Sequence, residues 1–247
     1  MGCGANTAQP SKTAPPAETA PIGVPKSAPN VTTVAVPDTA QVSSTVLTSS
    51  TTAAATTTTT IPAPCKVMFV SDSVGIDLID NGLRDRLAFA GCTLKWTGGQ
   101  RGIALVDGAQ LLANASDVAA DAVVVMLGYH DANSNGRAGR YPGFIDTVMQ
   151  AAGQRLVVWP MYGAPDDCSA NYKAGIGMAN QSLQDATARW PNLRLVDYPS
   201  LLAAHPEYSQ KRCPHLLASG SKEVAGWLAG QIRETVNAAL AAGQPTI

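Results

Sequence analysis

The chain from residue 65 to 247 is expected to form a three-layer α/β/α sandwich around a five-stranded parallel sheet. Five short apolar segments alternate with longer segments whose apolar residues recur at helical spacing. The short segments are continuously apolar, which is typical of strands that are covered by helices on both faces. This part of the chain is long enough for one domain with a sizeable core.

The five expected strands are residues 66–70, 93–96, 121–128, 155–162 and 193–198. A helix is expected over 74–91, because apolar residues recur at helical spacing there and Gly91 follows them. Further helices are expected over 103–115, 141–153, 170–190 and 219–243. Ser219 or Ser221 would cap the start of the last helix, and Gly243 would follow its end.

Residues 1–64 have a different composition from the rest of the chain. They are rich in Ala, Thr, Ser and Pro and show no hydrophobic periodicity, so we expect a disordered tether. Cys3, between two glycines, resembles the lipidated cysteine of bacterial lipoproteins, although no charged and apolar leader precedes it. Two alternatives stay open: a lipid anchor whose true start lies upstream, or an ordinary cysteine in a disordered tail.

The charge of the chain limits the partners that it can have. A net charge of −1, with 14% charged residues, gives no basic field for nucleic acid and no polybasic membrane patch. No apolar run reaches the length of a membrane span. No cluster of metal ligands is apparent, and we expect no cofactor.

The other four cysteines suggest two disulfides in an exported protein. Cys65–Cys92 is the favoured pair, because each residue directly precedes a strand and the two strands are expected to be neighbours. Cys168–Cys213 would then be the second pair. The alternative is four buried free thiols.

Several candidate functional residues fall at the carboxyl ends of the expected strands, where parallel sheets bind ligands. Ser73 follows the first strand, a glycine-rich segment (98–102) follows the second, and His130 follows the third. His215 lies just before the last helix, whereas His205 precedes a proline in an expected surface loop. A serine nucleophile needs a base and oxyanion donors. Taken alone, Ser73 also fits a helix N-cap.

Four sequence blocks in this order resemble those of the SGNH (GDSL-type) esterases and acyl hydrolases. They are Ser71-Asp72-Ser73 with Gly75, the segment 97–102, Gly128–Asp131 with His130 where the family has Asn, and Arg212–His215. The resemblance extends from about Lys66 to the end of the chain, and it implies a flavodoxin-like sheet. It also implies that Ser73 is the nucleophile and His215 the base. The oxyanion would be held by the Ser73 N–H, the Gly102 N–H (or that of Gly99) and the His130 side chain.

Two positions depart from the pattern of this family. Arg212 stands where the family has the acid that orients the histidine, and loss of such an acid can lower the rate about 10⁴-fold. If Cys168–Cys213 forms, Asp166 or Asp167 could reach His215 instead. The alternatives are a Ser–His dyad that is aided by a backbone carbonyl, and a site with impaired catalysis. Beside His130, Asp131 either fixes the tautomer of the imidazole or is a turn residue.

The sequence therefore predicts an exported serine ester hydrolase that acts through an acyl-enzyme on Ser73. Its substrate would be a small-molecule, lipid or glycan ester. Transfer of the acyl group to a cell-envelope glycan is one alternative, because it uses the same residues. A non-catalytic domain that binds a glycan or lipid is the other, and Arg212 favours it.

Overall fold

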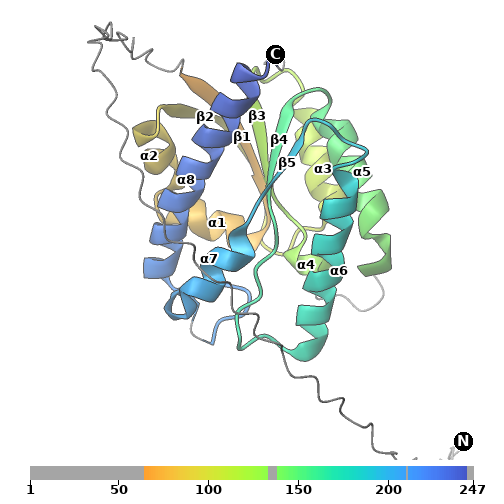
Figure 1. Ribbon diagram of the computed structural model, residues 1–247, viewed down its shortest axis with the longest axis vertical. Coiled ribbons are helices and arrows are strands. Elements are labelled where there is room, and N and C mark those ends of the chain that lie inside the picture. Colours follow the sequence, from red (N-terminus) through yellow and green to blue (C-terminus); the bar gives the residue numbers. More distant parts are fainter. Residues whose placement is uncertain (1–63, 133–137, 210, 244–247) are drawn as a thin grey trace, which may run out of the picture. The chain divides into compact units, whose positions relative to one another are not determined.

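A computed structural model describes residues 64–132, 138–209 and 211–243, and it has a sheet of five parallel strands in the order β2-β1-β3-β4-β5 (Figure 1). The strands are β1 (Cys65–Ser71), β2 (Cys92–Gly99), β3 (Ala122–Met126), β4 (Leu156–Pro160) and β5 (Leu193–Val196). Each coincides with a predicted strand, and the order is that of flavodoxin-like sheets. Cys3 and residues 1–63 of the expected tether lie outside the described residues.

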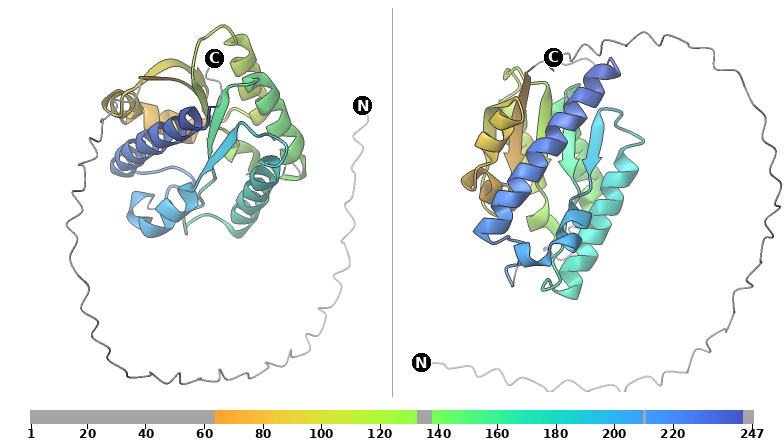
Figure 2. Two further views of the ribbon diagram at one scale, coloured as in Figure 1. Left: turned by 45° about the horizontal axis from the view of Figure 1, so that its top comes forward. Right: turned by 60° about the vertical axis from the view of Figure 1, so that its left-hand side comes forward.

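Helices cover both faces of the sheet, which confirms the predicted three layers (Figures 1 and 2). They are α1 (Ser73–Asp80), α2 (Leu83–Phe89), α3 (Leu105–Asn114), α4 (Tyr129–Ala132), α5 (Tyr141–Ala152), α6 (Ala170–Ala186), α7 (Tyr198–Ala204) and α8 (Ala218–Ala241). Short 3-10 turns span Ala138–Arg140 and Pro206–Tyr208. Helices α1, α2 and α8 pack together on one face, and α3, α5 and α6 pack together on the other.

Two predicted helices differ in detail from the observed ones. The helix expected over 74–91 is divided into α1 and α2 at Gly82, whose φ of 100° is a left-handed conformation that ends a helix. The last helix starts at Ala218, and its N-cap position is Leu217 with no side-chain cap. Ser219 and Ser221 therefore lie inside α8, and the predicted capping role was wrong.

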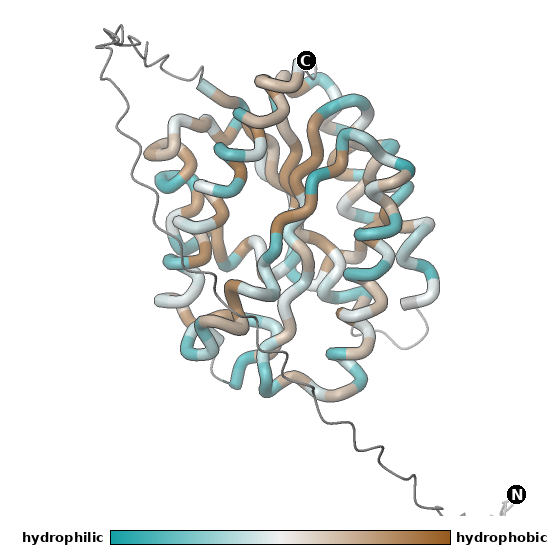
Figure 3. The backbone as a smooth tube through the Cα atoms, viewed as in Figure 1, coloured by the Kyte–Doolittle hydropathy of each residue, from teal (hydrophilic) through white to brown (hydrophobic). Residues whose placement is uncertain are grey.

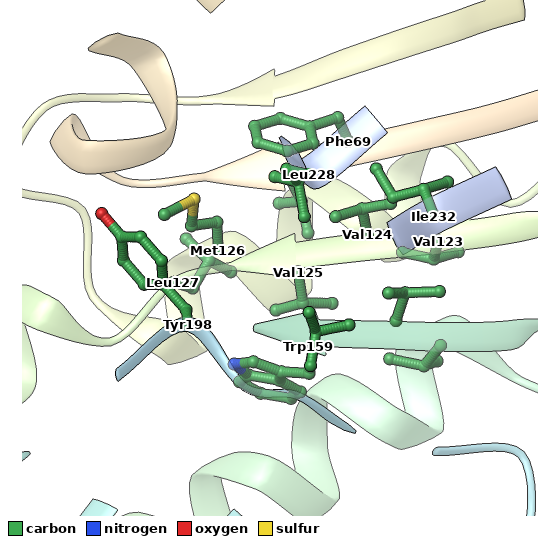
Figure 4. Close-up of a cluster of buried hydrophobic side chains, with 14 of the residues drawn as sticks. Phe69, Val123, Val124, Val125, Met126, Leu127, Trp159, Tyr198, Leu228 and Ile232 are labelled. Atoms are coloured by element: carbon green, nitrogen blue, oxygen red, sulfur yellow. The ribbon is translucent and has the colours of Figure 1, made fainter. Parts of the chain in front are cut away.

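The core explains why the central strands β3 and β4 are continuously apolar, whereas the edge strand β2 alternates between buried and exposed residues along most of its length. All side chains of β3 and β4 are buried, and the hydrophobic part of the backbone trace runs through the middle of the sheet (Figure 3). Figure 4 shows Phe69 of β1 and Leu228 and Ile232 of α8 beside the valines of β3. Each such side chain contributes about 1.5–3 kcal/mol when fully buried. The carboxyl end of the sheet is thus built on a closely packed core.

Both predicted disulfides are present. Cys65–Cys92 joins the first residues of β1 and β2, with 4.4 Å between the Cα atoms, and the two residues are partners in the sheet register. Cys168–Cys213 joins the segment before α6 to the loop before α8, with a Cα–Cα distance of 5.1 Å. Disulfides persist in oxidising compartments, so this pair of bonds indicates an exported protein. Of the described helices, none is both long and apolar enough to cross a membrane.

Candidate active site

The chain leaves β1 in a tight turn that directs Ser73 toward the carboxyl edge of the sheet. Asp72 is the N-cap of α1, because its Oδ1 accepts the Val74 N–H at 3.1 Å. Ser73 is therefore the first helical residue and not the cap. A Cβ on Gly75 would clash with the Ser71 side chain, so glycine at this position lets α1 approach the strand end closely.

Ser73 and His215 are 142 residues apart in sequence, but the structure brings their side chains together. The distance from Ser73 Oγ to His215 Nε2 is 3.4 Å. On the other side of the imidazole, His215 Nδ1 lies 2.7 Å from Oδ2 of Asp77. Both ring nitrogens thus face polar partners, in the order that a serine, a histidine and an acid have in a catalytic triad.

The carboxylate at this imidazole is Asp77, where we expected Asp166 or Asp167. Asp167 Oδ2 accepts the Cys213 N–H at 3.1 Å, so it reaches the backbone of the histidine loop and not the ring. Asp166 is exposed and lies 3.6 Å from Lys173 Nζ. The disulfide prediction was right, but the acid that we inferred from it was not.

Arg212 does not occupy the place of the acid in space. Its side chain is exposed, and its carbonyl oxygen accepts the His215 N–H at 2.6 Å. A short local hydrogen bond and the neighbouring Cys168–Cys213 disulfide therefore shape the loop that presents His215. The arginine contributes its backbone to that loop.

Asp77 was missed because the search for an acid was confined to the last sequence block and its disulfide partner. A signal was present in the segment Ser-Val-Gly-Ile-Asp (73–77), which begins a predicted helix. Residues four apart lie on the same helical face, so Asp77 had to point in roughly the direction of Ser73.

The predicted site residues line one cavity of about 140 Å³ at this edge of the sheet. It is lined by Ser73, Gly102, Tyr129, His130, Tyr172, Pro214 and His215. Gly99 lines a neighbouring cavity of about 440 Å³, which shares Gly102 with the first. A Cβ on Gly99 would meet the Ser71 carbonyl group, so Gly99 allows β1 and β2 to approach each other. Of the two glycines, Gly102 is therefore the one placed to act beside Ser73.

Asp72 links the serine turn to the turn that carries His130. Its Oδ2 accepts the N–H groups of Gly128 and Tyr129, at 3.1 and 2.9 Å. Burial raises the pKa of the Asp72 carboxyl to about 7, because the desolvation cost outweighs the three N–H bonds that lower it. One buried side chain thus holds two of the four sequence blocks in register.

Buried tyrosines hold the other side of the His130 turn. The hydroxyl groups of Tyr162, Tyr141 and Tyr172 donate to the carbonyl oxygens of Leu127, Gly128 and Tyr129 respectively. Burial raises the pKa of these three tyrosines. Their hydroxyl groups therefore stay protonated as donors, and the backbone before His130 is fixed on both its N–H and its C=O groups.

Asp131 holds the start of a helix. The side chain is buried, and its Oδ2 accepts the N–H of Leu105, the first residue of α3, at 2.8 Å. Because α3 follows the glycine loop, this bond joins the His130 block to the Gly102 block. Within the described part of the chain, no group of three or more His, Cys, Asp or Glu residues is arranged to hold a metal ion.

No protein-family model matches the sequence, and no curated protein matches it either. Solved structures do match. The peptidoglycan O-acetyltransferase A C-terminal catalytic domain of Streptococcus pneumoniae is 17% identical, with a TM-score of 0.56 over 72% of this chain and 95% of that chain. A lipase/acylhydrolase from Enterococcus faecalis is 19% identical, with a TM-score of 0.54 over 69% of this chain and 96% of that chain.

A member of the lipolytic G-D-S-L family from Veillonella parvula is 15% identical, with a TM-score of 0.56 over 68% of this chain and 97% of that chain. The resemblance seen in the four sequence blocks therefore holds for the three-dimensional structure. The domain has the fold of the SGNH (GDSL) lipolytic proteins. At such low identity the match establishes the fold, and the chemistry must be argued from the residues of this chain.

Proposed function

We propose that this protein is a serine hydrolase that cleaves carboxylic esters through an acyl-enzyme on Ser73. The observation that carries the proposal is the line of contacts from Ser73 Oγ through the His215 imidazole to Asp77. The 3.4 Å separation of Ser73 and His215 is long for a hydrogen bond. Such contacts are often long in the absence of substrate and shorten in the reacting complex.

Each group in this line has a distinct task. His215 Nε2 takes the proton of Ser73 Oγ while that oxygen attacks the ester carbonyl carbon. Asp77 accepts the Nδ1–H, which keeps Nε2 free to accept and stabilises the imidazolium that forms. The carbon–oxygen bond to the alcohol then breaks, and the leaving oxygen takes its proton from His215. Water releases the acyl group by the same steps in reverse order.

The negative charge that forms on the carbonyl oxygen would be held by donors that line the same cavity. The Ser73 N–H lies at the N-terminus of α1, where the helix dipole favours negative charge. The Gly102 N–H and the His130 side chain complete the set. An imidazole N–H can donate as the amide of Asn does in the resembling family, so the exchange preserves this role.

A fluorophosphonate probe and p-nitrophenyl acetate hydrolysis test the proposal together. The unaltered protein is expected to be labelled at Ser73 and to hydrolyse the ester, and Ser73→Ala is expected to lose both properties with an unchanged circular dichroism spectrum. Ser182→Ala is the matched control, because Ser182 lies on the exposed face of α6 and bonds only its own helix backbone. Retention of turnover by Ser73→Ala would refute the assignment.

Transfer of the acyl group to a glycan hydroxyl is a second candidate. It is supported by the likeness to a peptidoglycan O-acetyltransferase domain. Both reactions share the acyl-enzyme and differ only in whether water or a sugar hydroxyl attacks it. Mass spectrometry of peptidoglycan fragments incubated with the enzyme and an acetyl ester separates them, since only transfer adds an acetyl group to the fragment.

A non-catalytic binding domain was favoured by the missing acid at Arg212. Asp77 removes that argument, because it meets the imidazole at 2.7 Å. The fluorophosphonate experiment decides between these two functions, since a site without an activated serine is not labelled.

We further propose that the domain acts in the cell envelope, attached through a lipid on Cys3. The support is the glycine-flanked cysteine followed by a Ser/Thr/Pro-rich segment. Mass spectrometry of the native protein tests this, and an unmodified N-terminal methionine would exclude it.

A further inference from the structure

Arg101 connects two parts of the proposed active site that are distant in sequence. Its Nη1 lies 2.7 Å from Oδ1 of Asp77, and its Nη2 lies 3.2 Å from Oδ2 of Asp80. It is also the residue directly before Gly102, whose φ of 75° is a left-handed conformation. The guanidinium therefore fastens the glycine loop to α1 next to the carboxylate that contacts His215.

The two oxygens of Asp77 are divided between two partners. Oδ2 faces His215 and Oδ1 faces Arg101, so the guanidinium sets the rotation of the carboxylate about its Cβ–Cγ bond. The ion pair also raises the pKa of Arg101, through the hydrogen bond and the charge of Asp77. A planar guanidinium that bridges two carboxylates has more directional strength than a single ammonium.

We propose that Arg101 is a positioning residue, which orients Asp77 for His215 and holds the Gly102 N–H beside Ser73. The inference rests on the proposed esterase function and deepens it. A purely structural role is not sufficient to explain the arrangement, because the Arg101 side chain is 53% exposed and exposed ion pairs add little to stability. The two contacts of Arg101 therefore matter more for the orientation of Asp77 and for the charge beside it than for the stability of the fold.

The test measures steady-state kinetics for Arg101→Met and Arg101→Lys with p-nitrophenyl acetate. For Arg101→Met, we expect kcat to fall about 10- to 100-fold and KM to change less than about threefold, because the loss concerns the geometry of the transition state. Arg101→Lys should restore only part of kcat, because an ammonium keeps the charge but lacks the fixed planar geometry that orients Asp77.

Two further measurements keep this proposal separate from the proposed function. Arg84→Met removes another arginine, which donates to the Leu94 carbonyl oxygen of β2 at 3.4 Å, and it should leave kcat unchanged. In an Asp77→Asn background, Arg101→Met should lower kcat by a smaller factor than it does in the unaltered protein, because both substitutions disturb the same Asp77–Arg101 contact. A kcat for Arg101→Met within about twofold of that of the unaltered protein overturns the role of Arg101, whereas activity retained by Ser73→Ala overturns the esterase itself.

Discussion

Replacement of Asp77 by Asn tests the position of the acid most directly. The side chain keeps its shape, but only one of its two terminal atoms can still accept a hydrogen bond. Arg101 is purely a donor and lies 2.7 Å from Oδ1, so the amide oxygen is expected to face the guanidinium. The amide NH₂ then faces His215 Nδ1, and the imidazole must carry its proton on Nε2, the atom that should accept from Ser73.

The magnitude follows from this tautomer. Loss of the correct tautomer in a serine triad lowers kcat about 10⁴-fold, or about 5.5 kcal/mol of transition-state stabilisation. Asp77 is partly exposed, with 19% side-chain accessibility, so water can replace part of the lost interaction. We therefore expect kcat for p-nitrophenyl acetate to fall 10³- to 10⁴-fold, as an order of magnitude, with little change in KM.

The assay compares three carboxylates, each changed to its amide, by steady-state kinetics and circular dichroism. Asp80→Asn is the matched control, since Asp80 bonds the same arginine from the same helix without a contact to His215, and its kcat should stay within about threefold. Asp167→Asn disturbs only the Cys213 N–H and should have an intermediate effect. A loss below tenfold for Asp77→Asn, with a larger loss for Asp167→Asn, would refute the reasoning.

Removal of Cys168–Cys213 by paired Ser substitutions should lower both stability and kcat, whereas removal of Cys65–Cys92 should lower stability alone, because it lies at the opposite end of the strands. Each loss of stability should be about 2–4 kcal/mol in urea titrations, and an equal effect of both pairs on kcat would contradict the placement. Asp72 should make stability fall as the pH rises from about 4 to 7, since the folded protein keeps the proton that the unfolded chain releases near 3.8. The contribution of Asp72 is on the order of 4 kcal/mol, and an Asp72→Asn variant whose urea midpoint depends on pH as that of the unaltered protein does would contradict it.

Most of the fold could be predicted because its signals are local and repeated. The strands β1, β3 and β4 are buried on both faces, and each therefore appeared as an apolar segment such as 122–127. The edge strand β2 instead alternates between buried and exposed positions along most of its length. The break between α1 and α2 was missed, because Ile79 and Leu83 are four residues apart and continue the helical spacing across it. Only the conformation of Gly82 reveals the break, and a glycine within a periodic segment does not by itself specify a left-handed backbone.

The residues of the site differ in the same way. Some could be predicted from the local sequence, and others are brought together only by the fold. Ser73, His130 and His215 could be found because each follows a strand or precedes a helix in a resembling block. Asp77 belongs to no such block, Arg101 lies in one only as the residue before Gly102, and only folding places the two against each other. A chain of 24 residues separates them, and no periodicity in the sequence relates a helix residue to a loop on the neighbouring strand.

The position of Asp77 on α1 determines which segments of the chain tertiary packing has to align in the site. When the acid precedes the histidine on the same loop, the loop and the serine must be brought into register by tertiary packing. Here Ser73 and Asp77 lie about one turn apart on α1, so the helix itself fixes the proposed nucleophile relative to the proposed acid. The remaining freedom belongs to His215, whose loop is tied by a disulfide on one side and by contact with Asp77 on the other. An arginine at position 212 is compatible with catalysis for this reason, because the loop has to present only the imidazole.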